Sequence, residues 1–323
     1  MKKRKVLVAN RGEIAVRIIR ACQGLGIDTV LVVSEADTDS LGARLADEVV
    51  CIGPPQVRES YLNLSKIMDA ASKTGADALH PGYGFLAENP ELPEACERNG
   101  IIFIGPRSET MRQLGDKIRA RDLAGKSHVP MTVGSEGLGG FHAVEAEVRR
   151  IGFPVIFKAA AGGGGRGMRI VMEPKDLKTA FDMASNEARQ AFGDATLFVE
   201  RYVRNARHVE VQVIGDNSGN VIHLGLRDCT TQRRYQKVIE EAHPPNLPDD
   251  LSDRILEAAV ALTSSIGYNS AGTVEFLVDK DRHEFYFMEV NTRIQVEHPV
   301  TEEITGIDLV REQIQVGFGA PLS

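Results

Sequence analysis

Short apolar runs alternate with amphipathic stretches through the first hundred residues, and this alternation constrains the fold more than any other feature. The runs of strand length are Lys5–Ala9, Asp28–Val33, Glu48–Ile52, Ala78–His80 and Ile101–Ile104. Between the first two, Gly12–Gly24 has helical periodicity. Strands that alternate with helices form βαβ units, so the sequence predicts a doubly wound parallel sheet. No Gly-x-Gly-x-x-Gly fingerprint follows the first strand, which argues against classical NAD binding.

The pattern changes in the second half of the chain. A helix at 144–151, a strand at 154–158, a glycine-rich turn, a strand at 169–172, a long helix at 174–192 and a strand at 196–200 are predicted. From His208 to Val213 polar and apolar residues alternate strictly, which predicts an antiparallel sheet with one polar face. The chain should therefore combine α/β and α+β architecture.

Composition excludes several classes of protein. The 38 Lys+Arg and 45 Asp+Glu give a formal net charge of −7, which argues against a broad nucleic-acid-binding surface. No run approaches the roughly 20 apolar residues that span a bilayer, and the apolar run after the basic start ends at Asn10-Arg11, too early for a signal peptide. The four cysteines lie far apart, unlike those of zinc ribbons or disulfide scaffolds. We expect a cytoplasmic protein that binds neither nucleic acid nor membrane.

The densest chemical signal lies between residues 289 and 297. In an extended chain, one face would carry Glu289, Asn291, Arg293, Gln295 and Glu297. A hairpin centred on Arg282 would place Glu275 directly opposite Glu289, and two like charges there are destabilising. A divalent cation would reverse that cost, because carboxylate and amide oxygens are ligands that magnesium takes. A solvated polar face is the alternative interpretation.

Glycines at 162–165 and 167 follow Lys158 closely. Such a run frees backbone N–H groups to turn toward an anion, and the lysine supplies a point charge suited to a phosphate. The pattern is not a P-loop, since Gly-x-x-x-x-Gly-Lys-Ser/Thr is absent. A flexible hairpin turn remains the alternative.

Basic residues also gather between positions 227 and 237, where Arg227, Arg233, Arg234 and Lys237 accompany Asp228. In an acidic chain this cluster would favour a small anion or the phosphates of a nucleotide, although a solvated face is the commoner outcome. We interpret the neighbouring Cys229 as a buried small hydrophobe, because no base for it can be identified.

Taken in order, these motifs resemble those of the biotin carboxylases, which are ATP-grasp enzymes. The matching segments are Val8–Ala15, His80–Leu86, Gly115–Lys117, Lys158–Met168, Arg227–Cys229 and Glu289–Pro299, and the likeness runs from Lys5 to Ser323. The resemblance implies a ligase reaction in two steps. ATP and bicarbonate would form carboxyphosphate and ADP, and the carboxyl group would then pass to the ureido nitrogen of biotin.

The resemblance also implies roles for individual residues. Lys117 and Lys158 would hold the phosphates of ATP, under a lid containing Gly163, Gly164 and Gly165. Further ATP contacts would come from Glu200, Arg201, Tyr202, Val203, His208, Gln232, Glu275 and Glu289. Mg²⁺ or Mn²⁺ would be bound by Glu275, Glu289 and Asn291. Bicarbonate and biotin would be positioned by Lys237, Arg293, Gln295, Val296 and Glu297. Of these, Lys237, Arg293 and Glu297 would be catalytic, with Glu297 as the general base and Arg293 stabilising charge on biotin.

The same likeness implies a division into three parts and a set of partners. Residues 1–115 would form the N-terminal biotin carboxylase domain, 116–203 the ATP-grasp part with its lid, and 204–323 the C-terminal catalytic part. Family modules continue by on the order of 100 residues, so the last sheet should lack its final part. Biotin would arrive on a separate carrier protein or domain, with a carboxyltransferase as the second partner and a homodimer as one assembly.

Two other functions remain open from the sequence alone. One is a different ATP-grasp ligase that joins a carboxylate to an amine, which should lack the Arg293–Glu297 set together with Lys237. The other is a truncated homologue that binds nucleotide without turnover.

Overall fold

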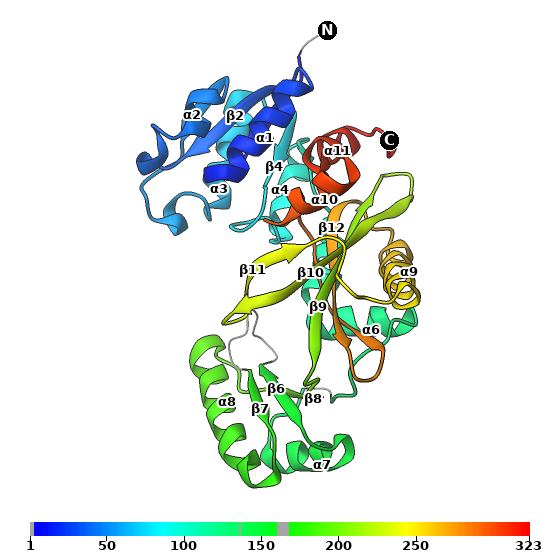
Figure 1. The fold of residues 1–323 in the computed structure, drawn as a ribbon. Coiled ribbons are helices and arrows are strands. Elements are labelled where there is room, and N and C mark those ends of the chain that lie inside the picture. The colour runs from blue at the N-terminus through cyan, green and yellow to red at the C-terminus, as the bar shows by residue number, and fades with distance from the viewer. Residues whose placement is uncertain (1–2, 136, 160–167) are drawn as a thin grey trace.

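The computed structural model describes residues 3–135, 137–159 and 168–323. Three sheets follow one another along the chain, with the first at the top of Figure 1, the second at the bottom and the third between them. They lie within residues 1–115, 116–203 and 204–323 respectively, the ranges of the proposed domain division. None of the described helices is both long and apolar enough to cross a membrane.

The first sheet is parallel, with strand order β3-β2-β1-β4-β5. Its strands are β1 (Lys5–Val8), β2 (Asp28–Val33), β3 (Glu48–Cys51), β4 (Ala78–His80) and β5 (Ile102–Phe103), and its helical segments are α1 (Gly12–Gly24), η1 (Glu35–Asp37), α2 (Leu41–Leu45), η2 (Val57–Glu59), α3 (Leu64–Thr74) and α4 (Glu91–Arg98). Alternate residues of β1 enter opposite cores: Val6 and Val8 pack with α1, whereas Leu7 packs with α3 and α4. Helices therefore cover both faces, and the predicted doubly wound sheet is confirmed.

The second sheet is antiparallel, with strand order β7-β6-β8. The helix α5 (Ser108–Gly115) ends the first part, and the second part contains α6 (Lys117–Lys126), α7 (Phe141–Ile151), β6 (Val155–Ala159), β7 (Arg169–Val171), η3 (Pro174–Asp176), α8 (Leu177–Phe192) and β8 (Leu197–Arg201). Phe157 of β6 packs edge-on against Phe181 of α8, which fixes the helix on one face of the sheet. Lys158, the next residue, consequently faces the other side. The glycines at 163–165 lie outside the described residues.

The third sheet is antiparallel, with strand order β11-β10-β9-β12-β13. It contains β9 (Ala206–Gly215), β10 (Val221–Arg233), β11 (Gln236–Glu241), β12 (Ser270–Asp279) and β13 (Glu284–Asn291), with α9 (Asp249–Ser265), α10 (His298–Thr305) and α11 (Leu309–Gly317) packed around it. Alternation in β9 sends Val209, Val211 and Val213 into the core beneath α9. The opposite face is polar as predicted, yet Glu210 and Gln212 on it are fully buried.

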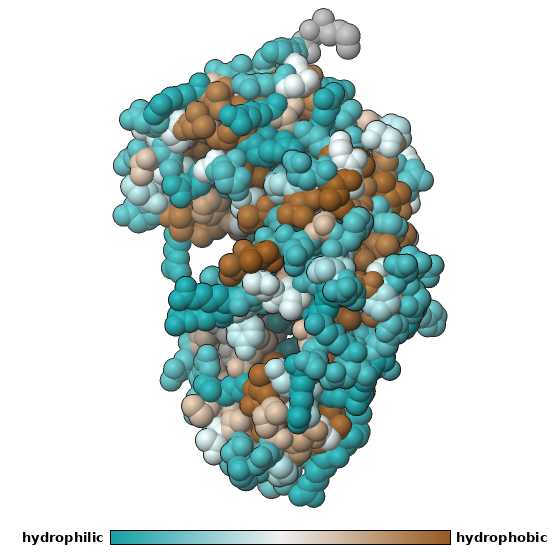
Figure 2. Space-filling view, in the orientation of Figure 1, coloured by the Kyte–Doolittle hydropathy of each residue, from teal (hydrophilic) through white to brown (hydrophobic). Residues whose placement is uncertain are grey.

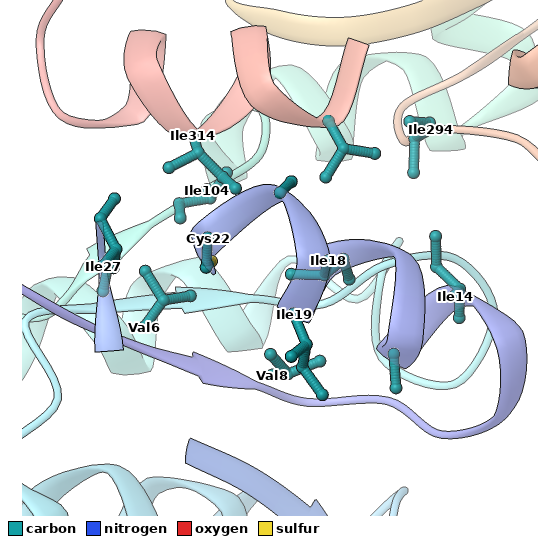
Figure 3. Packing of buried hydrophobic residues seen from close by; sticks show 14 of the residues in the cluster. Val6, Val8, Ile14, Ile18, Ile19, Cys22, Ile27, Ile104, Ile294 and Ile314 are labelled. Carbon is teal, nitrogen blue, oxygen red and sulfur yellow. The ribbon is translucent and has the colours of Figure 1, made fainter. Parts of the chain in front are cut away.

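The C-terminal helix returns to the first domain and joins the first and third sheets. Figure 3 shows Ile314 of α11 and Ile294 pointing toward α1, where they meet Ile14 and Ile18 in one apolar cluster. Ile294 is completely buried, and burial of such a side chain stabilises the fold by about 1.5–3 kcal/mol. This contact anchors the segment after β13, which carries several of the predicted site residues.

Candidate functional site

A row of charged residues crosses the polar face of the third sheet. Arg227 of β10 lies opposite Glu210 of β9. Glu210 in turn lies opposite Glu275 of β12, and Glu275 lies opposite Glu289 of β13. Residues directly opposite one another present their side chains to the same face, so three carboxylates are brought into one line. This line requires counter-charges, and the side chains around it supply them.

The predicted pairing of Glu275 with Glu289 is confirmed, although the register near the turn differs from the expectation. There, Asp279 pairs with Glu284 and Phe276 with Phe287. The register then shifts by one between Glu275 and Phe276, leaving Met288 as the extra residue of a β-bulge. Without this bulge, Met288 would lie opposite Glu275 and the Glu289 carboxylate would be carried to the other face.

The two facing carboxylates differ in acidity. Burial alone would raise the pKa of Glu275, but His208 and Lys237 hold it well below its usual range. The pKa of Glu289 is raised, first by burial and then by the charge of Glu275. The Asn291 amide lies beside them and donates to Glu275 Oε1 at 2.9 Å. Two carboxylates are hard oxygen donors of the kind that Mg²⁺ takes, and Asn291 would add its amide oxygen if the amide, whose oxygen now accepts from Arg293, turned over.

Lys237 provides the central positive charge. Its ammonium donates to Glu210 Oε2 at 2.5 Å, to Glu297 Oε1 at 2.6 Å and to Glu275 Oε1 at 2.9 Å. Burial would lower the pKa of Lys237, yet these three carboxylates raise it well above its usual value. Burial would likewise raise the pKa of Glu297, and Lys237 lowers it overall. At neutral pH the site therefore holds the Lys237 cation beside the ionised carboxylates of Glu275 and Glu297.

The segment 292–297 reaches this cluster without being a strand, so the expectation of an extended chain through Glu297 was wrong. The strand β13 ends at Asn291. Gln295 nevertheless donates to Glu275 Oε1 at 3.1 Å, and Glu297 forms the N-cap of α10. Val296 between them keeps 62% of its surface exposed. The path of residues 292–297 is therefore set by the burial of Ile294 and not by strand alternation.

The environment of Arg227 differs from the one that the sequence predicted. A basic cluster for a small anion was predicted between 227 and 237, yet the Arg227 side chain is fully buried. Its guanidinium donates to five acceptors, namely Glu210, Gln212, Thr273, Gln295 and Thr301. No N–H is left for an added anion. The sequence contained one signal for this role, which was the run of polar residues on the inner face of β9.

A second group of charges lies on the second sheet and on α6. Glu200 accepts hydrogen bonds from Lys158 Nζ at 2.7 Å, Thr132 Oγ1 at 2.9 Å and Arg121 Nη1 at 3.0 Å. Burial would raise the pKa of Glu200, but the two cations lower it overall. Lys117, at the start of α6, has a pKa lowered chiefly by burial, and the charge of Glu289 opposes that effect.

A histidine and a glutamine extend the first group of charges beyond Glu275. Gln232 Nε2 lies 2.8 Å from His208 Nδ1. His208 Nε2 lies 3.0 Å from Glu275 Oε2. Burial would lower the pKa of His208, and the Glu275 carboxylate raises it overall. This histidine thus adds a second cationic partner for Glu275 when it is protonated.

One cleft of about 790 Å³ brings most of the predicted site residues together. The predicted residues that line it are Lys117, Lys158, Glu200, His208, Gln232, Lys237, Glu275, Glu289, Asn291, Arg293, Gln295, Val296 and Glu297. In the space-filling view the molecule is hollowed between the second and third sheets (Figure 2). Arg201, Tyr202 and Val203 do not line the cleft, and Arg201 instead contacts Tyr286. Arg121 and Glu240 line it but were not anticipated from the sequence.

Comparison with protein-family models gives two matches that together cover nearly the whole chain. Residues 2–111 match the model described as "Biotin carboxylase, N-terminal domain". Residues 116–323 match the model described as "Carbamoyl-phosphate synthase L chain, ATP binding domain". The second model alone accounts for more than half of the chain.

Individual relatives agree with these models. "Biotin carboxylase 1" of Bacillus subtilis is 50% identical over 99% of this chain, which spans 71% of that protein. A mitochondrial methylcrotonoyl-CoA carboxylase subunit alpha from Oryza sativa is 52% identical, but this chain spans only 44% of it. The biotin carboxylase domain of Hydrogenobacter thermophilus 2-oxoglutarate carboxylase, solved with MgADP and bicarbonate, is 46% identical with a TM-score of 0.92, covering 100% of this chain and 71% of its own. This chain belongs to the biotin carboxylase family.

Proposed function

We propose that this chain catalyses the ATP- and bicarbonate-dependent carboxylation of biotin, as the biotin carboxylase component of a biotin-dependent carboxylase. The observation that carries the proposal is the Lys237 ammonium held among Glu210, Glu275 and Glu297, beside a carboxylate pair suited to a metal ion. The reaction forms a carbon–nitrogen bond at the expense of ATP, so the enzyme is a ligase.

Lys237 and Glu297 would have different roles toward bicarbonate. The cation at Lys237 would attract the anion, and Glu297, ionised because its pKa is lowered, would accept the proton of bicarbonate. The deprotonated oxygen would then attack the terminal phosphorus of ATP, giving carboxyphosphate and ADP. Arg293 lies at the cleft and would stabilise negative charge on biotin, while Gln295 and Val296 would help to position the substrates.

The phosphates of ATP would lie between the second and third sheets. Lys158 and Lys117 face the cleft and would each contribute a positive charge to the phosphates. In this structure the Lys158 ammonium binds the Glu200 carboxylate. A phosphate of ATP would either bind Lys158 together with that carboxylate or take its place. Gly163–Gly165 would form the lid, and Arg201, Tyr202, Val203, His208 and Gln232 would complete the nucleotide site.

Glu275, Glu289 and Asn291 would hold Mg²⁺ or Mn²⁺. When bound, the metal would neutralise the charge that builds up on transferred phosphoryl oxygens. The pairing of β12 with β13 positions the two carboxylates, because the bulge at Met288 places Glu275 and Glu289 on one face. Magnesium is the metal with support among the solved relatives, and manganese is proposed on the chemistry of the oxygen donors alone.

The same reaction implies partners for this chain. Biotin would be presented by a separate carrier protein or domain, and a carboxyltransferase would use the carboxylated product. We further propose a homodimer, a cytoplasmic location and a division of the chain at residues 115 and 203. The domain solved from Hydrogenobacter thermophilus is described as a dimer, which supports the dimer proposal.

The test measures ADP release from the purified chain with ATP and Mg²⁺. Turnover should rise when bicarbonate is added and rise further with free biotin. Lys237→Ala and Glu297→Ala should abolish the bicarbonate-dependent part while ATP binding changes only a few fold. Binding of ATP without bicarbonate-dependent turnover would refute the proposal and favour a nucleotide-binding homologue.

A further inference from the structure

We propose that Arg227 is a positioning residue for the carboxylation reaction, because it holds the segment carrying Glu297 and the carboxylate that anchors Lys237. Arg227 does not itself line the cleft and is fully buried beneath it. Its effect would pass through the residues that it binds. The inference rests on the proposed function for its catalytic consequence, but its geometric part can be tested without turnover.

The guanidinium is completely satisfied by side chains from several elements. Nε donates to Glu210 Oε1 at 2.6 Å, and Nη1 donates to Gln212 and Thr301, both at 2.8 Å. Nη2 donates to Gln295 at 2.9 Å and more weakly to Thr273 at 3.4 Å. These acceptors come from β9, β12, α10 and the segment before α10. A planar fork with five donors can connect them all, whereas a lysine ammonium cannot.

Two of the acceptors flank the proposed general base. Gln295 precedes Glu297 by two residues and Thr301 follows it by four. Both are bound to the same buried cation, so the chain is fixed on each side of Glu297. Glu297 is also the N-cap of α10, and any tilt of that helix would move its carboxylate. A displacement of about 1 Å at a reacting group can cost on the order of 100-fold in rate.

A third connection runs through Glu210. This carboxylate bridges two cations, because Oε1 accepts from Arg227 and Oε2 accepts from Lys237. Loss of the guanidinium would leave Glu210 free to rotate toward Lys237 and draw its ammonium away from Glu297. Arg227 therefore governs the positions of both groups that act on bicarbonate, and neither group acts on the adenine end of the cleft.

Thr301→Val is the sharpest test because it keeps the shape of the side chain and removes one acceptor of Arg227. The matched control is Thr305→Val, one helical turn further along α10. Thr305 Oγ1 donates to the backbone carbonyl of Thr301 and accepts from the Ile307 N–H, but it does not touch the guanidinium. We expect Thr301→Val to lower kcat/KM for bicarbonate about tenfold, the equivalent of one hydrogen bond to a charged group. The KM for ATP should stay within about twofold, and Thr305→Val should leave both constants near wild type.

Arg227→Lys keeps the charge and removes the fork, so its kcat/KM for bicarbonate should fall about 100-fold. Urea unfolding of each variant establishes that it is folded. If Arg227→Lys does not fold, Thr301→Val alone decides. Unchanged bicarbonate kinetics in Thr301→Val, or equal losses in Thr305→Val, would overturn the positioning role.

Amide hydrogen exchange separates this inference from the proposed function. In Thr301→Val, amides of residues 293–300 should exchange faster than in wild type, whereas those of β1 and β2 should not change. Thr305→Val should leave residues 293–296 protected. If the wild-type chain shows no bicarbonate-dependent turnover, the proposed function fails, and the exchange pattern still decides whether Arg227 holds the segment.

Discussion

The Glu88 carboxylate binds two consecutive residues of the site segment, accepting from Arg293 Nε at 3.0 Å and from the Thr292 backbone N–H at 3.3 Å. Glu88 lies in the loop between β4 and α4 of the first domain, 205 residues before Arg293. The arginine is further fixed by Asn291 Oδ1 and by the carbonyl of Ile294, both at 3.2 Å. The first domain thus orients a side chain proposed to act in the third.

Glu88→Gln should impair the reaction without impairing nucleotide binding. The amide keeps a single acceptor oxygen and removes the charge that pairs with Arg293, so the guanidinium gains freedom. We expect a three- to tenfold fall in kcat, about 1 kcal/mol, measured as bicarbonate-dependent ADP release. Glu91→Gln, at an exposed position of α4, is the control and should behave as wild type. A kcat equal to that of the control would show that Arg293 does not depend on Glu88.

Glu289→Gln should raise the Mg²⁺ requirement and slightly stabilise the metal-free protein. The change removes one of two like charges that face each other, which relieves about 0.5 kcal/mol of repulsion in the absence of metal. It also removes an anionic ligand, so the Mg²⁺ concentration for half-maximal ADP release should rise at least about tenfold. Urea unfolding in a chelator measures the first effect, and a Mg²⁺ titration measures the second.

Glu284→Gln is the matched control, because Glu284 also lies opposite an acidic residue, Asp279, on the same pair of strands. It sits near the turn and does not line the cleft. If the two variants required the same Mg²⁺ concentration, Glu289 would not be a ligand of the metal.

Much of the first domain was predictable because local pattern and tertiary environment agree there. The bounds of α1, β2 and β4 are the predicted ones, since each apolar run is buried on both faces or on one helical stripe. The pairing of Glu275 with Glu289 was also predicted, but the equal spacing from Arg282 succeeded only because Met288 forms a bulge. A bulge depends on contacts with neighbouring strands, and residue types alone do not reveal it.

The rest of the site depends on contacts between residues distant in sequence. Arg227 seemed one of several surface cations, and only the fold shows that Gln295 and Thr301 close over it. The convergence of 292–297 on the cleft likewise comes from Ile294 in the core of the first domain. Periodicity carries no information about such long-range packing, so extended structure was wrongly expected beyond Asn291.

Lys158→Ala should weaken ATP binding more than it lowers the maximal rate. The lysine is proposed to contact the phosphates in the ground state as well as in the transition state, so the ATP concentration for half-maximal turnover should rise about 10- to 100-fold. Lys126→Ala removes an exposed lysine of α6 and serves as the control. An unchanged ATP requirement would exclude Lys158 from the phosphate site. Glu200 should remain ionised in the variant, because Arg121 and Thr132 still bind it.

His80→Asn should make the stability of the protein less sensitive to acid. His80 is completely buried beside Arg17 of α1, His298 of α10 and Gln313 of α11, and burial first, then the Arg17 charge, lowers its pKa to about 3. Because the unfolded chain has a histidine pKa near 6.5, it binds more protons than the folded chain between these values. The stability that His80 contributes is therefore present above about pH 6.5 and is lost as pH falls, by up to about 1.4 kcal/mol per pH unit.

Asparagine can accept the hydrogen bond that His80 Nδ1 takes from the Gly82 N–H, at 3.0 Å, but it does not titrate. Urea unfolding at intervals from pH 7.5 to pH 4.5 should show a large difference between wild type and His80→Asn at the upper end. That difference should shrink steadily below pH 6.5, because only the wild type takes up a proton at this position on unfolding. His223→Asn, which removes an exposed histidine of β10, is the matched control. A difference for His80→Asn that stays constant over the whole range would mean that the buried imidazole does not resist protonation.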